Sequence, residues 1–208
     1  MNYPLHIGFK TFALGNQGSV TDSTGSVIFF VKQKAFRLRE AITVFTDTTQ
    51  STPLCTIRAN KIIDFSAQFF FANMSGEALG SVKRAGARSL WKADYTTLDN
   101  DGNPVMKINE ENGWIKVLDG LLRDIPVVGI FSGLMFNPSY LVTRPDGTAI
   151  ARIKKEKAFF EGKFKIEKLG EIEPEEELRF LLGCFTSILL ERFRGVGGSS
   201  EIHPGHSA

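Results

Sequence analysis

The chain has little of several features that place proteins in specialised classes. Only two of its 208 residues are cysteines, Cys55 and Cys184, so no disulfide framework is expected and a reducing compartment is the simpler setting. Residues 1–10 have no basic region followed by an apolar one, so no signal peptide is expected. A net charge of only +2 provides no global field toward nucleic acid or membranes. We therefore expect a cytoplasmic protein, with a peripheral position at a membrane as the alternative.

Catalytic and cofactor-binding motifs are also missing from the sequence. It has no phosphate-binding Walker loop and no dinucleotide fingerprint, and the serine of residues 129–133 is displaced by one position from a nucleophile elbow. His203 and His206 lie close to the end of the chain and make a poor metal site by themselves. No histidine is near either cysteine in sequence, which disfavours a Cys–His nucleophile. We expect a protein that is not an enzyme and that has no catalytic residues, no cofactor and no metal site.

One acidic segment nearly matches a calcium-binding loop. Asp99, Asp101 and Asn103 have the right spacing, and Glu110 follows eleven residues after Asp99. The loop requires glycine at its sixth position for a sharp turn, and this chain has Pro104 there. The segment is therefore predicted to be a plain turn.

One segment in the last part of the chain is apolar on nearly all sides and is predicted to form a helix over residues 174–194. It begins at Pro174 among five glutamates and ends with two arginines before Gly195. A helix without a polar face has to be surrounded. The eleven uncharged residues 180–190 are fewer than the roughly 20 that a membrane span needs, so we expect a buried core helix, with a membrane anchor as the alternative. Three small residues in it would let neighbouring backbone approach closely: Gly183, Thr186 and Ser187.

The region before this helix repeats a hairpin-sized unit, in which an extended segment leads through a polar turn into an apolar and basic strand. The turns are predicted near residues 24–25, 53, 75–76, 101–102 and 146–147. Asp-Gly between extended segments is a strong hairpin signal. Apolar and charged residues alternate over residues 151–154 and 164–167, as in antiparallel strands with one buried face. About a dozen such strands are typical of a barrel or sandwich.

Three segments fall outside the hairpin pattern. Residues 113–122 suit a strand or a short helical turn, and the apolar residues 125–137 suit a buried strand or loop under a barrel. Residues 195–208 are rich in glycine and serine and are expected to be a disordered tail. The predicted organisation is therefore a single domain at residues 1–194, followed by this tail.

The hairpin repeat, the segment 129–140 (GIFSGLMFNPSY) and the closing apolar helix together resemble the tubby C-terminal-like superfamily, within it the LURP-one-related and phospholipid-scramblase-like branch. The resemblance covers about residues 5–194. It implies a mainly β fold, a closed antiparallel barrel of about 12 strands around a central apolar C-terminal α-helix. Tubby proteins of this superfamily bind phosphoinositide headgroups on a basic outer patch. The chain lacks the cysteine-rich run of the scramblases.

Two basic stretches are candidates for such a patch. Over residues 151–168, seven basic residues stand against three acidic ones, a net charge of +4. The basic residues of this stretch are Arg152, Lys154, Lys155, Lys157, Lys163, Lys165 and Lys168. The second stretch consists of Lys83, Arg84, Arg88 and Lys92. Near an anionic bilayer such cations contribute on the order of 1 kcal/mol each, whereas on an edge strand lysines also prevent aggregation.

The predicted function is a non-catalytic binding module that engages anionic phospholipid, or a protein partner, on the barrel exterior. Nucleic acid is not an expected partner, because no recognised binding motif is present. Two alternatives remain open: a small-ligand carrier or enzyme with a pocket beside the barrel, and a scramblase-like protein whose helix inserts into a bilayer.

Overall fold

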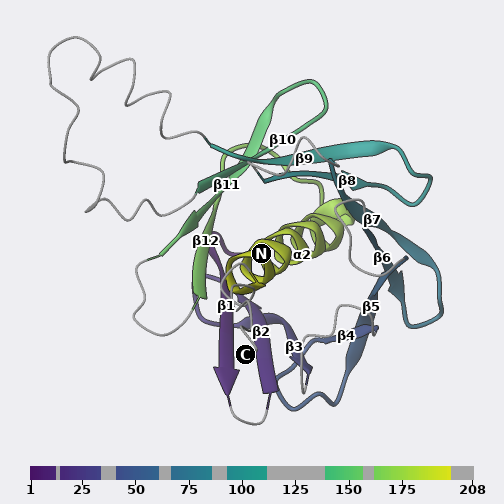
Figure 1. The fold of residues 1–208 in the computed structure, drawn as a ribbon, viewed down its shortest axis with the longest axis vertical. Coiled ribbons are helices and arrows are strands. Elements are labelled where there is room, and N and C mark those ends of the chain that lie inside the picture. Colours follow the sequence, from purple (N-terminus) through teal and green to yellow (C-terminus); the bar gives the residue numbers. More distant parts are fainter. Residues whose placement is uncertain are drawn as a thin grey trace, which may run out of the picture.

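A computed structural model describes residues 1–12, 15–33, 41–60, 67–85, 93–111, 139–156 and 162–197. Of the predicted features, segments 113–122 and 125–137 and the tail from residue 198 lie outside these ranges. The described part is a β-barrel with a helix through its centre (Figure 1).

Twelve strands are present in the described part of the chain, and they confirm the predicted barrel. Each strand pairs antiparallel with its neighbours in sequence, and β1 pairs with β12 to close the barrel. The strands are β1 (Leu5–Phe12), β2 (Gly15–Thr21), β3 (Val27–Gln33), β4 (Ile42–Phe45), β5 (Pro53–Ala59), β6 (Gln68–Asn73), β7 (Ala78–Arg84), β8 (Asp94–Leu98), β9 (Pro104–Glu110), β10 (Ser139–Thr143), β11 (Ala149–Lys155) and β12 (Gly162–Lys168). Closure leaves no free sheet edge of the kind that would pair with another chain.

Five hairpins at one end of the barrel share a single turn geometry, which explains the sequence repeat. In each, the N–H of the fourth turn residue donates to the carbonyl of the first, for example Gly102 to Asp99 at 3.2 Å. The fourth residue has positive φ, between 85° and 91° at four glycines and 63° at Gln50. A register shift follows in each strand pair, as expected for a turn joined to a β-bulge.

The helix α2 (Pro174–Gly197) runs through the barrel from the hairpin end to the opposite end (Figure 1). It starts at the predicted proline but continues to Gly197, three residues beyond the predicted end at Arg194. Its start is held by Arg144, which occupies the first turn position of the last hairpin and forms an ion pair with Glu176 and a 3.1 Å hydrogen bond to the carbonyl of Glu171. This ion pair lowers the pKa of the Glu176 carboxyl.

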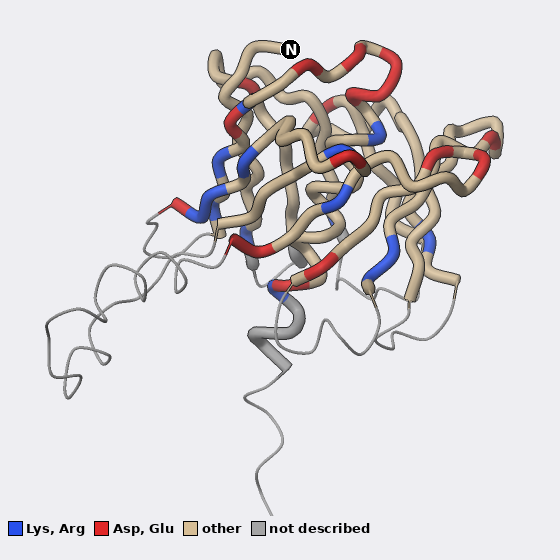
Figure 2. The backbone as a smooth tube through the Cα atoms, turned by 90° about the horizontal axis from the view of Figure 1, so that it is seen from above, with Lys and Arg blue, Asp and Glu red and all other residues tan. Residues whose placement is uncertain are grey.

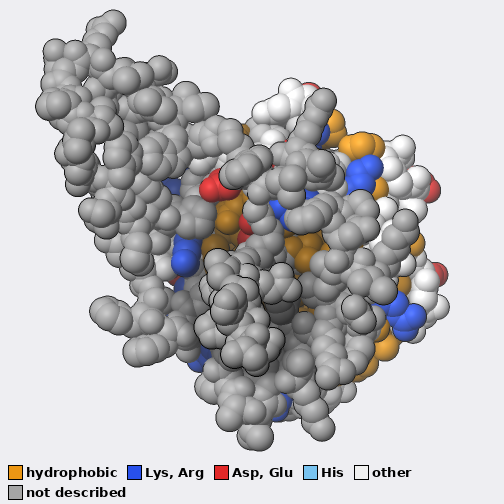
Figure 3. All heavy atoms as spheres, in the orientation of Figure 1, with side chains coloured by type: hydrophobic (Ala, Val, Ile, Leu, Met, Phe, Trp, Pro, Cys, Tyr) orange, Lys and Arg blue, Asp and Glu red, His pale blue; other side chains and the backbone are white. Residues whose placement is uncertain are grey.

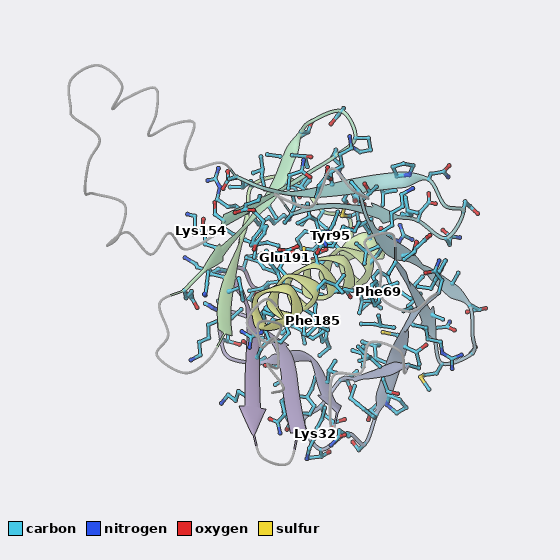
Figure 4. All side chains as sticks on the ribbon, viewed as in Figure 1. Lys32, Phe69, Tyr95, Lys154, Phe185 and Glu191 are labelled. Carbon is cyan, nitrogen blue, oxygen red and sulfur yellow. The ribbon has the colours of Figure 1, made fainter. Side chains whose placement is uncertain are left out.

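The sequence pattern predicted a helix without a polar face. The structure shows that one narrow stripe along the helix consists of small or polar residues. Arg179, Gly183, Ser187 and Glu191 recur at every fourth position, which places them on one face. This face lies against β7 and β8: Arg179 Nε donates to the carbonyl of Leu79 at 2.7 Å, and the Tyr95 hydroxyl donates to Glu191 at 2.6 Å. Figure 4 shows Tyr95 and Glu191 side by side.

Small residues let this face of α2 approach the barrel wall closely, as expected. A Cβ atom added to Gly183 would lie 2.7 Å from Thr97 Oγ1. On the opposite face the space is filled by Phe185, whose ring stacks on Phe9 at 5.1 Å and meets Phe29 edge-on at 5.2 Å. The helix therefore lies closer to one side of the barrel, and aromatic rings fill the other side.

The apolar segment that sequence analysis singled out is core. Six of its apolar members have at most 1% of their surface exposed: Phe180, Leu181, Leu182, Cys184, Phe185 and Ile188. In the part of the chain that the structure describes, no helix has the length and apolar character needed to cross a membrane.

Candidate anionic-ligand surfaces on the barrel

Charge is distributed unevenly along the barrel axis. We call the end with the five hairpins and the start of α2 the hairpin end, and the end where α2 leaves the barrel the rim end. Figure 2 shows most acidic positions at the end that carries the N-terminus, which is the hairpin end. The described acidic residues there are Asp22, Asp47, Glu77, Asp99, Asp101, Asp146, Glu171, Glu173, Glu175, Glu176 and Glu177, against Arg144, Lys168 and Arg179. Eleven acidic and three basic residues make this end strongly negative.

The rim end has the opposite sign. Five of the six strands that run toward it carry a cation within their last three residues. Its basic residues with described side chains are Lys10, Lys32, Arg58, Lys83, Arg84, Lys154, Lys155, Lys163 and Arg192, and its acidic residues are Asp94, Glu110, Glu111, Glu156 and Glu191. Nine basic against five acidic residues give a net charge of +4, and four charged residues at mid-barrel belong to neither end.

Several acidic residues of the hairpin end stabilise the turns by accepting hydrogen bonds from backbone N–H groups. Asp99 Oδ1 accepts hydrogen bonds from the backbone N–H groups of Asp101 at 3.0 Å and Asn103 at 2.8 Å, and Asp22 and Asp47 make equivalent bonds. Hydrogen bonds to the ionised form hold the pKa of each of these carboxyls below its ordinary value. The segment that resembled a calcium loop is thus the predicted turn. Among the described residues, no cluster of three or more potential ligands could hold a metal ion.

The first predicted basic stretch forms a wall over β11 and β12, in which most cations are already paired. Arg152 Nε lies 2.9 Å from Glu111 Oε2, and Lys154 and Lys165 lie 2.8 and 3.2 Å from the carboxylate of Glu167. Lys168, at the hairpin end, pairs with Glu171 at 3.3 Å. Lys155 and Lys163 extend toward the rim, and Lys157 lies outside the described residues. Figure 4 shows Lys154 pointing outward on this side.

The second predicted stretch lies elsewhere on the barrel. Lys83 is exposed on the outer face of β7, whereas Arg84 lies over the ring of the buried Tyr95, 5.9 Å from its centroid. Arg88 and Lys92 are outside the described residues. Strands β8, β9 and β10 separate β7 from β11, so the structure does not join the two stretches into one patch.

Lys83 instead belongs to a second wall, over β5–β9, which sequence reasoning missed. Its members are Arg58, Phe70, Lys83 and Lys107, all exposed. Pairing places Arg58 opposite Phe70, and it places Thr96 between Lys83 and Lys107. None of these three cations forms an ion pair with any residue of the described chain. Lys83 was predicted as part of the second stretch, whereas Arg58 and Lys107 are single cations in sequence, and only their outward positions in alternating strands could have indicated them. Figure 3 shows Lys and Arg side chains on both flanks of the barrel.

The barrel interior contains two cysteine thiols and, near the rim, the guanidinium of Arg192. Burial raises the pKa of the Cys55 thiol to about 12 and also raises that of Cys184, so neither forms a thiolate at neutral pH. Near the rim, the Arg192 guanidinium lies 4.9 Å from the Phe9 ring centroid, and desolvation lowers its pKa. Gly162 leaves room for it, because an added Cβ would overlap the guanidinium.

Comparisons with known proteins give one structural likeness. No protein-family model matches the chain, and no curated protein matches it. Among solved structures, the X-ray structure of a protein from Arabidopsis thaliana shares 12% sequence identity with a TM-score of 0.48, over 90% of this chain and 92% of that chain. A likeness at this level establishes neither a shared family nor a shared function. The two charged walls therefore have to be interpreted from their own chemistry.

Proposed function

We propose that this protein is a non-catalytic binding module that engages anionic phospholipid surfaces through the exterior of its barrel. The observation that carries the proposal is the axial separation of charge, with a net +4 at the rim end and eleven carboxylates at the hairpin end. The resemblance to the tubby-like superfamily agrees with a basic outer surface of this kind.

Charge separation matters more here than net charge. Electrostatic attraction to a membrane decays over a Debye length of about 8 Å at physiological ionic strength. A barrel strand of seven residues is already about 23 Å long. With the rim toward the bilayer, its cations lie within the membrane field at on the order of 1 kcal/mol each, while the acidic hairpin end is held outside that field. A near-neutral chain can thus bind an anionic surface in one orientation.

Flotation with vesicles of phosphatidylcholine, with and without phosphatidylserine or a phosphoinositide, tests this function. Binding is expected only with anionic lipid, and raising the salt concentration should weaken it. Lys83→Gln at the rim should reduce binding about fivefold, from the loss of about 1 kcal/mol. Lys168→Gln removes the same charge at the hairpin end and serves as the matched control, which should bind as the unmodified protein does. No binding to any anionic vesicle at low salt would reject the function and would leave a protein partner as the alternative.

A further inference from the structure

We propose that the rim half of the wall over β5–β9 is the part of the barrel that contacts the bilayer. The barrel axis is then tilted toward this wall, with the hairpin end away from the membrane and Phe70 in the interfacial region of the bilayer. This inference rests on the proposed lipid-binding function and assigns it to a surface other than the predicted β11–β12 wall. It comes from an exposed aromatic ring, its cationic neighbours and the fact that these cations form no ion pair with a described residue.

Phe70 is unusual among the aromatic side chains of the barrel. It is 45% exposed, whereas its neighbours Phe69 and Phe71 point into the core and are 2% and 1% exposed. Among the aromatic side chains whose exposure the structure describes, it is the one that is exposed. The ring is not part of the core, because side chains alternate along β6 and the Phe70 side chain points outward. In water the ring exposes apolar surface, and the bilayer interface is a medium that accepts aromatic rings.

The neighbours of Phe70 are suited to anionic headgroups. Arg58 is directly opposite on β5, and Ser81 is opposite on β7 with Lys83 two residues further on. From Lys83, the row continues through Thr96 to Lys107. With strands about 4.8 Å apart, the face from Arg58 to Lys107 spans four spacings, about 19 Å. Long cationic side chains around a ring can bind headgroup phosphates while the ring lies deeper.

The ion pairs distinguish this wall from the β11–β12 wall. On the β11–β12 wall, binding to lipid would break the ion pairs of Arg152, Lys154 and Lys165, or would bring their carboxylates close to the anionic headgroups. On the β5–β9 wall, no such ion pair has to break within the described chain, because Arg58, Lys83 and Lys107 form none there. One carboxylate, Asp94, adjoins the face near the rim and lies opposite Asn109. Counting it, the face still has a net charge of +2, and it lies in the rim half and middle of the barrel.

A bilayer, rather than a free anion, is the ligand that uses both parts of this face. A soluble phosphate or inositol phosphate would satisfy the cations but would leave Phe70 in water. The ring and the cations should therefore contribute in different ways: the cations set the salt dependence of vesicle binding, and the ring adds a component that does not depend on salt.

The test compares vesicle partitioning of four full-length variants on phosphatidylcholine with phosphatidylserine. Phe70→Ala should lower the partition coefficient about tenfold and leave its salt dependence unchanged. Arg58→Gln/Lys83→Gln should lower it more than tenfold at low salt and flatten the salt dependence. Two matched controls should have little effect: Lys154→Gln/Lys165→Gln on the other wall, and Met74→Ala, another exposed apolar side chain, at the hairpin end. Unchanged melting temperatures would show that all variants fold.

A site-specific probe gives an independent readout. Because Cys55 and Cys184 are fully buried, Phe70→Cys and Met74→Cys can each be labelled selectively with an environment-sensitive fluorophore. Anionic vesicles should shift the emission to the blue at position 70 and leave it unchanged at position 74. If the protein binds anionic vesicles but only Lys154→Gln/Lys165→Gln weakens binding, this face is wrong and the lipid-binding function stands. If the unmodified protein binds no anionic vesicle, the function and this inference are both rejected.

Discussion

A methyl group added at position 183 is expected to test how closely the helix lies against the barrel wall. Alanine in place of glycine in a helix interior normally stabilises by about 1 kcal/mol. Here the added Cβ would lie 2.7 Å from Thr97 Oγ1, closer than the packed core allows, and 3.4 Å from Thr97 Cγ2, which is already at contact distance. Overpacking of this kind typically costs about 1–3 kcal/mol. We therefore expect Gly183→Ala to lower the free energy of unfolding by up to about 2 kcal/mol despite its better helix propensity.

Thr97 supplies the control for this prediction. Its side chain is 1% exposed, and its hydroxyl has no hydrogen-bond partner in the described part of the chain. Thr97→Ala removes the clashing Oγ1 and the neighbouring Cγ2, and it loses no hydrogen bond to a described residue. In the Thr97→Ala background, Gly183→Ala should stabilise by about 1 kcal/mol, so the two changes should couple by about 1–3 kcal/mol.

Urea unfolding of the four proteins in this cycle measures the coupling directly. A chain of this size shifts its melting temperature by about 2–4 °C per kcal/mol, so thermal melts provide a second measure. If Gly183→Ala were equally stabilising with and without Thr97, the helix would not lie against β8 at this turn, and the described placement of α2 would be refuted.

Four further predictions concern the core, the helix anchor and the turns. Phe185→Ala should lower the free energy of unfolding by about 3–5 kcal/mol, and a loss below 1 kcal/mol in urea unfolding would contradict its central packing. Tyr95→Phe should cost about 1–3 kcal/mol, since it breaks the bond to Glu191; a melting temperature equal to that of the unmodified protein would show that this bond is not an anchor. Gln50→Gly should stabilise by about 0.5 kcal/mol, because Gln50 has a φ of 63°, and a fall in the urea midpoint would count against this. The turn carboxyls have lowered folded-state pKa values, so their stabilisation is complete above their ordinary pKa of 3.8 and is lost as pH falls below it; the melting temperature should drop between about pH 5 and pH 2, less steeply in Asp47→Asn, and a flat profile would refute this.

Local signals were sufficient for the elements of this fold. A hairpin depends on a few adjacent residues, and the glycines with positive φ and the turn carboxylates are visible as Asp-Gly and similar pairs. The start of α2 was predictable from Pro174 and the glutamates around it. Its end was not, because Gly195 is tolerated within the last turn of a helix that continues to Gly197.

The candidate surfaces were less predictable, because pairing partners lie far apart in the chain. Arg152 appeared to be an available cation, yet it meets Glu111, 41 residues away. Arg58 and Lys107 are single cations between apolar residues, and Phe70 is the middle one of three consecutive phenylalanines, so the sequence does not indicate a surface that they share. Counting charge along a segment overestimates a patch whenever neighbouring strands bring carboxylates beside it.

By itself, the sequence determined the element types, the hairpin repeat and the need to surround the apolar helix, because these depend on local dihedral preferences and on the cost of exposing apolar surface to water. Only the tertiary structure decided which cations are paired, which end of the barrel is acidic and where α2 lies against the wall. Closure of the barrel sets these features, since strand register determines which side chains from distant segments become neighbours.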